Sequence, residues 1–228
     1  SWRSRRSNSG DFMSFTFTTL KTAVQDYTQN SETTFVNTLP TFIKNAEERI
    51  FKSVDLDYFR KNVSGNMSTG NKFLGMPTDY LASFSLSFTD SSGNVNFILQ
   101  KDVNFLQTYT PAGNSTTGEP KYYAPFDFQN FILAPTPSAD FVTELHYYYR
   151  PTSITTTSDG TSWLGTNAPD ALLYGTLCEA YIFMKGDPDL FKTYTERYQE
   201  SLVRLKNYAE GMENSDNYRM GMSRVQKT

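Results

Sequence analysis

The spacing of hydrophobic residues changes twice along the chain. Near both ends, apolar residues recur every three or four positions, whereas in the middle they alternate with polar residues at every second position. The first spacing is typical of an amphipathic helix and the second of a strand with one buried face. The pattern therefore predicts an α+β protein, which we expect to be a helical bundle with an inserted, small antiparallel β domain.

The same changes of period predict where these parts begin and end. We expect the bundle to comprise residues 13–57 and 165–212, and the β domain residues 58–164. Residues 1–12 are polar and basic, which predicts a flexible N-terminal arm. Residues 213–228 are also mainly polar, and we expect them to form an extended C-terminal tail.

Four segments show the helical spacing, namely residues 17–27, 33–54, 170–186 and 189–211. Pro40 lies within the second segment. Because proline has no N–H to donate and its ring clashes with the preceding turn, we expect a kink there, or a new helix start capped by Thr38. We expect Asp170 to cap the third helix and Gly186 to end it.

Strict alternation predicts the strands. Segments 84–88 and 95–99 alternate apolar and polar residues on either side of a turn at Gly93, which indicates a hairpin. Further strands are expected at 131–134 and 141–150, and a loop rich in Gly and Pro at 110–125. In the last strand one face carries Phe141, Thr143, Leu145, Tyr147 and Tyr149, and the other carries Val142, Glu144, His146, Tyr148 and Arg150.

The composition excludes several classes of protein. With 228 residues and a net charge of -3, the chain lacks the basic character of a dedicated nucleic-acid binder. Cys178 is the only cysteine, so intrachain disulfides and cysteine-rich metal sites are excluded. No apolar run approaches the roughly 20 residues that cross a bilayer. The 18 Phe and 15 Tyr are the unusual feature, because aromatic side chains are enriched at protein interfaces.

The residues that could support catalysis are few. His146 is the only histidine, and the sequence offers it no nucleophile except Cys178, which lies in an apolar helical segment typical of a buried, inert thiol. The acidic pairs at 55–57 and 187–189 are expected to cap helices rather than to bind a metal. We therefore expect no catalytic residue, no cofactor and no metal site.

Several segments, taken together and in order, resemble the head-to-tail adaptor or connector proteins of tailed bacteriophages, of the tail tubular protein A kind found in short-tailed phages. The segments that carry the resemblance are residues 35–50, 118–124, 144–151, 163–164, 171–185 and 216–221.

The resemblance implies a structural virion protein without catalytic residues. It implies a homo-oligomeric ring of about twelve copies between the portal protein and the tail nozzle or tail tube. Genome DNA would pass through the lumen without sequence-specific binding, and no membrane would be involved. The protein would be made in the cytoplasm of the bacterial host and reside in the neck of the virion.

Candidate interface residues come from two places. A strand cannot point three successive side chains to one side, so the run Tyr147, Tyr148 and Tyr149 offers at least one tyrosine beyond the core for a neighbouring subunit. The resemblance implies that the C-terminal end contacts the portal, and the candidate residues there are Tyr218, Arg219, Arg224 and Lys227.

Three alternatives remain open. The first is another head or tail completion protein with similar helices. The second is a carbohydrate-binding or receptor-binding module in which Trp163 and the tyrosines stack on sugar rings. The third is a hydrolase, which would need a pair of carboxylates that the sequence does not align.

Overall fold

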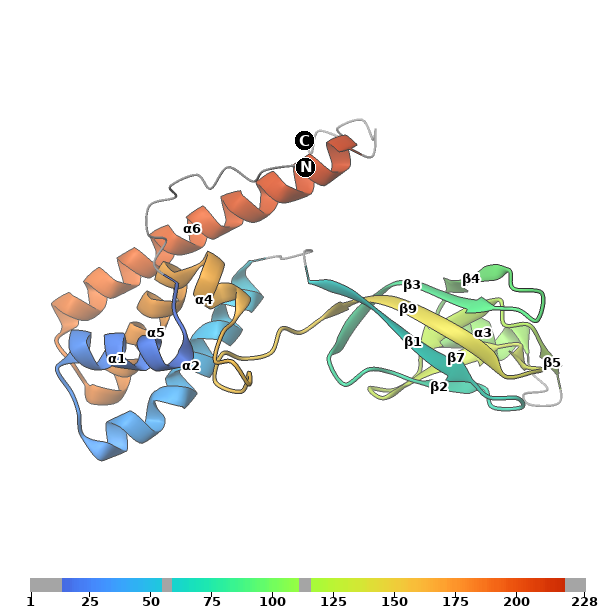
Figure 1. Ribbon diagram of the computed structural model, residues 1–228, viewed down its shortest axis with the longest axis horizontal. Coiled ribbons are helices and arrows are strands. Elements are labelled where there is room, and N and C mark those ends of the chain that lie inside the picture. The colour runs from blue at the N-terminus through green and yellow to red at the C-terminus, as the bar shows by residue number, and fades with distance from the viewer. Residues whose placement is uncertain (1–13, 55–58, 111–115, 220–228) are drawn as a thin grey trace, which may run out of the picture. The chain divides into compact units, whose positions relative to one another are not determined.

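The computed structural model describes residues 14–54, 59–110 and 116–219, with side chains described as far as residue 211. The predicted N-terminal arm lies outside these ranges. The chain divides into two compact units (Figure 1). Residues 14–54 and 152–219 belong to a helical unit, and residues 59–151 form a β unit with one short helix. Helices and strands are both well represented, which confirms the α+β class.

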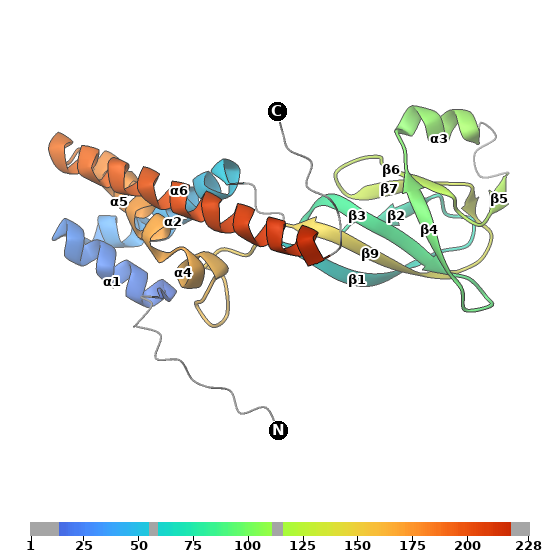
Figure 2. The same ribbon diagram turned by 90° about the horizontal axis from the view of Figure 1, so that it is seen from above.

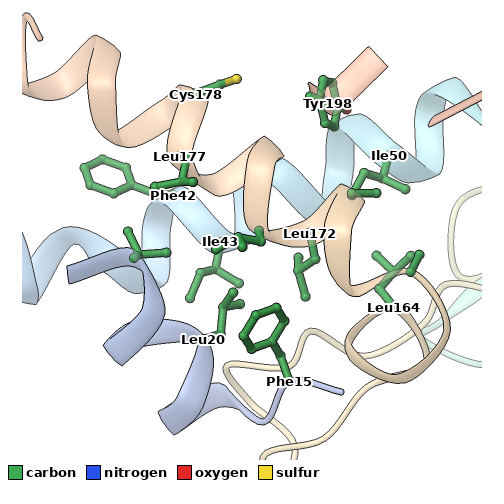
Figure 3. Packing of buried hydrophobic residues seen from close by; sticks show 14 of the residues in the cluster. Phe15, Leu20, Phe42, Ile43, Ile50, Leu164, Leu172, Leu177, Cys178 and Tyr198 are labelled. Atoms are coloured by element: carbon green, nitrogen blue, oxygen red, sulfur yellow. The ribbon is translucent and has the colours of Figure 1, made fainter. Parts of the chain in front are cut away.

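The helical unit is arranged around α5. This helix is apolar on almost every side, as expected of a buried helix, and it contacts each of the other helices described in the unit. Leu20 and Ile43 pack against Leu172 and Leu177 of α5 in the core (Figure 3). The helices are α1 (Phe17–Thr28), α2 (Thr33–Ser53), α4 (Trp163–Asn167), α5 (Pro169–Met184) and α6 (Pro188–Arg219).

Pro40 does not divide the second helix. It lies inside α2, which is a single helix of 21 residues, so the predicted new start at Thr38 is wrong. The Thr38 hydroxyl donates instead to the carbonyl of Thr34 at 2.7 Å, in the preceding turn. Burial of the apolar side of α2, which includes Leu39 and Ile43, holds the helix together across the proline.

Two other helix boundaries differ from those predicted. Asp170 is not the cap of α5, because Ala168 occupies that position and Pro169 is the first helical residue. α6 continues past Gly211 to Arg219, so residues 213–219 of the predicted tail are helical. A glycine in a helix costs about 1 kcal/mol relative to alanine but does not by itself end the helix.

The segment that follows the β unit packs with the helices. Ile154 is fully buried in the core of the helical unit, next to Leu164 of α4. Its backbone N–H donates to the carboxylate of Glu47 in α2 at 2.9 Å. The sequence pattern had assigned residues 152–164 to the β part, because they contain no helical spacing before Trp163.

The β unit contains a curled sheet of seven strands. Their order is β1-β9-β3-β4-β6-β7-β2, and a separate pair is formed by β5 and β8 (Figure 2). The strands are β1 (Arg60–Met67), β2 (Phe73–Gly75), β3 (Tyr80–Thr89), β4 (Val95–Gln100), β5 (Thr117–Gly118), β6 (Tyr122–Pro125), β7 (Asn130–Ala134), β8 (Thr136–Pro137) and β9 (Phe141–Tyr149).

Two apolar clusters stabilise this unit. The larger one lies on the inner side of the sheet and contains Leu86, Phe88, Ile98, Leu145 and Tyr147. The smaller one lies under the helix α3 (Val103–Tyr109), which covers β6 and β7.

The alternation in β9 was predicted correctly, whereas that in the hairpin was partly wrong. In β9, Phe141, Thr143, Leu145 and Tyr147 are buried, as expected. β3 and β4 do form the predicted hairpin, but Ile98 is the buried residue of β4 and its apolar neighbours point outward. In β3 the pairing shifts register between Ser83 and Ser85, and Phe84 at this bulge is exposed.

The sheet is not purely antiparallel. β4 pairs in parallel with β6, and β5 pairs in parallel with β8. Part of the predicted 110–125 loop is strand, namely β5 and β6. β1, β2 and α3 were missed, because their sequences are short or lack a regular alternation of apolar residues.

Candidate assembly surfaces

One side of the sheet carries exposed apolar residues, and we call it the outer face. On β9 it is formed by the alternate residues Val142, Glu144, His146 and Tyr148. The strand register places residues of β1, β3 and β4 on the same side. The outer face comprises Asn62, Ser64 and Asn66 of β1, Phe84, Ser85, Ser87 and Thr89 of β3, Val95, Phe97 and Leu99 of β4, and the four residues of β9.

The apolar side chains of this face are strongly exposed. Phe97 is 70% exposed, and Phe84, Val95, Leu99 and Val142 are each more than half exposed. Isolated exposed apolar residues are ordinary, but a group of them on one sheet face marks an interaction surface. The alternation in segments 84–88 and 95–99 could have predicted this surface, but alternation alone does not show which face of a strand is buried.

Few charges interrupt the outer face. The four strands that form it contain only Arg60, Lys61 and Glu144 as charged residues. The guanidinium of Arg60 lies 5.1 Å from the ring centre of Phe84, and Glu144 accepts a hydrogen bond from the side-chain amide of Asn62. Depletion of charge together with exposed aromatic residues is the composition of the central part of a protein interface.

The three tyrosines of β9 have different environments. Tyr147 is 1% exposed and belongs to the core, whereas Tyr148 and Tyr149 are half-buried. The Tyr147 hydroxyl donates to Asp79 at 2.7 Å, and Asp79 also pairs with Lys61. The isolated chain therefore presents only Tyr148 and Tyr149 of this run to solvent.

The contacts of Asp79 shift the pKa values of the whole group. Burial opposes the negative charge of Asp79, but the hydrogen bonds from Lys61 and Tyr147 outweigh it and hold the pKa of Asp79 below its ordinary value. The hydrogen bond to Asp79 raises the pKa of Lys61. Burial raises the pKa of Tyr147, and Asp79 adds to that effect. Lys61 and Asp79 therefore form a structural ion pair, which Tyr147 of β9 joins through its hydroxyl.

A second apolar surface lies at the C-terminal end of α5. Ile182 and Phe183 are about half exposed there, and Leu190 at the start of α6 is exposed as well. The Phe183 ring lies 5.2 Å from that of Phe42 and 6.4 Å from that of Phe35. The apolar sequence of α5 thus continues beyond the core and reaches the surface of the helical unit.

The C-terminal candidates are only partly described. Tyr218 and Arg219 lie in the last turn of α6, where the side chains are not described. Arg224 and Lys227 lie outside the described residues, and so does the acidic pair at 55–57. The other acidic pair caps α6, because the carboxylate of Asp187 accepts from the N–H of Asp189 at 2.8 Å.

No catalytic group is assembled among the described residues. His146 lies on the outer face with its ring 4.8 Å from that of Phe84, and Cys178 is buried in the helical unit. Burial raises the pKa of the Cys178 thiol, which keeps it protonated and unreactive. In the described ranges we find no group of three His, Cys, Asp or Glu residues able to hold a metal ion.

Two further observations bear on the alternatives. Trp163 is half-buried against the helical core, with its ring 6.4 Å from that of Tyr208, so its position gives no support to stacking on a sugar. Across the described segments, no helix has the length and apolar character required to span a bilayer.

Comparison with known proteins assigns the family. The model of the SU10 adaptor protein family matches residues 15–225, which is most of the chain and covers both compact units. A search of curated proteins gives no match. The match agrees with the resemblance found in the sequence. The chain therefore belongs to the SU10 adaptor protein family, and it is a bacteriophage head-to-tail adaptor.

Proposed function

We propose that about twelve copies of this chain form a ring between the portal protein and the tail nozzle or tail tube, and that genome DNA passes through the ring. In this proposal the chain is a virion component of a short-tailed phage, synthesised in the host cytoplasm and located in the neck. Its helical bundle, with the β domain inserted, acts as a scaffold and not as an enzyme.

The outer face of the sheet is the observation that carries this proposal beyond the family assignment. A ring subunit needs two different complementary surfaces, because each copy contacts one neighbour on each side. The outer face and the apolar end of α5 are two such surfaces, on different compact units. We include Tyr148 and Tyr149 in the subunit contact, and Tyr218, Arg219, Arg224 and Lys227 in the contact with the portal.

Passage of DNA is consistent with the charge of the chain. A net charge of -3 provides little attraction for the phosphate backbone, so a duplex in the lumen would slide rather than bind.

Co-sedimentation with portal rings tests the proposal. The purified chain is mixed with portal rings of the same phage and centrifuged through a density gradient. We expect the chain to move with the portal at a fixed ratio and to remain in the upper fractions without it. If the chain stays in the upper fractions in both runs, it is not a portal-binding adaptor ring, and a different place in the virion must be sought.

A further inference from the structure

β1 forms an open edge of the sheet. It pairs with β9 on one side and forms no ladder with any other described strand, although β2 at the other end of the curled sheet comes close to it (Figure 2). The N–H of Tyr149 donates to the carbonyl of Phe59 at 2.9 Å, so Phe59 and Tyr149 form a hydrogen-bonded pair of this ladder. Hydrogen-bonded and non-hydrogen-bonded pairs alternate along an antiparallel ladder. The residues whose backbone N–H and C=O groups point away from β9 are therefore Arg60, Asn62, Ser64 and Asn66.

Beyond its first two residues, Arg60 and Lys61, this edge lacks the features that protect edge strands. Residues 60–66 are all exposed, and residues 62–67 include neither a proline nor a charged side chain. None of the described residues forms a hydrogen bond with the outward backbone groups. An exposed edge strand with an uncharged stretch of this kind is a template for pairing with another strand. The edge can therefore take a partner strand, and on the outer face next to it Arg60 and Glu144 are the charged residues.

An antiparallel edge can be its own partner. If a two-fold axis places Asn62 opposite Asn62 of a second copy, Arg60 of each copy faces Ser64 of the other, and no like charges meet. Ser64 lies beside Glu144 of its own chain on the outer face. Arg60 of one copy then shares a row with Glu144 of the other, about two strand spacings or 10 Å away.

The charges on the edge favour this arrangement. Arg60 stacks on Phe84 but makes no ion pair with any described residue, and Glu144 has only the amide of Asn62 as a hydrogen-bond partner in the described structure. Both side chains project from the outer face. In the isolated chain Arg60 leans over Phe84, so it would have to turn away from that ring to reach across Ser64 towards the carboxylate of the other copy. We infer that β1 pairs with β1 of a second copy of this chain, so that the free protein is a two-fold dimer with one continuous sheet.

The inference concerns the free chain and does not rest on the proposed ring. A two-fold contact closes on itself, whereas a ring is built from heterologous contacts, so the two forms exclude each other at β1. The dimer would cover the β1 edge before assembly, and entry into the ring would have to separate the two copies. Control of assembly would then reside in the competition between these two contacts.

Sedimentation equilibrium of the full chain without portal tests the dimer. We expect a dimer with a Kd on the order of micromolar, because an edge contact is a small interface. Ser64→Lys places a cation opposite Arg60 of the other copy and should weaken the dimer at least about tenfold. Ser64→Glu is the matched control, since it adds a charge at the same exposed position but faces Arg60 with an attractive partner, and it should leave the dimer intact or strengthen it.

A charge exchange completes the test. The double variant Arg60→Glu with Ser64→Lys restores opposite charges and should dimerise again, although Ser64→Lys alone does not. Because Glu144 of the same chain lies opposite Ser64, the monomer should be slightly more stable with Ser64→Lys and slightly less stable with Ser64→Glu, and unfolding curves measure this difference. A wild-type chain that stays monomeric up to about 100 µM would overturn the inference. Equal effects of Ser64→Lys and Ser64→Glu on a wild-type dimer would also overturn it, because the contact would then lie elsewhere.

Discussion

Tyr198 carries a buried hydroxyl without a hydrogen-bond partner among the described residues. Its ring packs in the core of the helical unit close to Gly175, and the guanidinium of Arg49 lies 5.8 Å from the ring centre. Burial raises the pKa of Tyr198 to about 12, so the hydroxyl stays neutral. A buried polar group that loses its hydration without gaining a partner costs about 1–3 kcal/mol.

Tyr198→Phe should therefore increase the free energy of unfolding by about 1 kcal/mol, because it removes the unpaired hydroxyl and keeps the ring. Urea unfolding measures the change. Tyr194→Phe is the control, because the Tyr194 hydroxyl interacts with Tyr181 and its removal should give no gain. A loss of stability in Tyr198→Phe would mean that the hydroxyl has a partner, such as a bound water.

Glu47 is a buried carboxylate that fixes the segment after the β unit to α2. It is 4% exposed and accepts from the N–H of Ile154 and from the side chain of Ser153. Burial raises the pKa of Glu47 above its ordinary value of 4.5, although these hydrogen bonds oppose the shift. In the pH range just above 4.5 the folded chain therefore holds this proton more strongly than the unfolded chain does.

The free energy of unfolding should accordingly fall as the pH rises from 4.5 through the raised pKa of Glu47. Glu47→Gln keeps an acceptor for the Ile154 N–H without the charge, so it should remove this part of the pH dependence. Glu47→Ala leaves that N–H unpaired and should lose about 1–3 kcal/mol at all pH values. Urea unfolding at a series of pH values gives the free energy of unfolding of each variant. If this free energy depends on pH in Glu47→Gln as it does in the wild type, another group is responsible for the pH dependence.

At the scale of elements, α2 contains a proline that its packing tolerates. Pro40 cannot donate to the carbonyl of Val36, yet the helix runs from Thr33 to Ser53. Its buried side chains, such as Phe35, Ile43 and Ile50, hold both halves against the core. The energy of burial thus outweighs the poor helix propensity of one residue.

Pro40→Ala should restore the missing hydrogen bond and increase the free energy of unfolding by about 1–3 kcal/mol. Thermal unfolding followed by circular dichroism measures it. Thr41→Ala, at the next, exposed position of the same helix, is the control and should change stability by less than about 0.5 kcal/mol. A less stable Pro40→Ala would show that the ring of Pro40 contributes to packing that alanine cannot replace.

The sequence predicted the helices better than the sheet, for physical reasons. The apolar spacing of α1, α2 and α5 is maintained by burial in one core, so their extents were predicted nearly correctly. The polar strand β1 contributes little beyond Met67 to the core of its unit, and no alternation revealed it. The end of α6 was missed because Gly211 and the polar residues after it contain no apolar period.

The candidate surfaces show the same limit. Alternation in β4 places Val95, Phe97 and Leu99 on one face of the strand. Alternation alone does not show which face is buried, and in this strand Ile98, on the opposite face, lies in the core. The bulge beside Phe84 is set by pairing with β9, which no local pattern encodes. Conversely, Tyr147 was a candidate for contact, and its hydrogen bond to Asp79 shows that a buried tyrosine can satisfy its polar tip within the unit.

Both compact units expose apolar side chains, as expected of a protein whose apolar surfaces become buried when it assembles with other subunits. Phe97→Ser tests this for the outer face. Because Phe97 is 70% exposed, the variant should change the free energy of unfolding by less than about 0.5 kcal/mol. Its binding to portal rings, measured by co-sedimentation, should fall at least about tenfold, because Phe97 lies in the proposed contact between ring subunits; unchanged binding would contradict a role of the outer face in assembly. Val203→Ser, an exposed position on α6, should leave binding unchanged.

Native mass spectrometry of the portal ring, alone and after addition of the purified chain, counts the copies that bind. We expect the mass of the portal ring to increase in a single step by that of about twelve copies, whatever the oligomeric state of the free chain. Addition of one or two copies, or none, would contradict the adaptor ring.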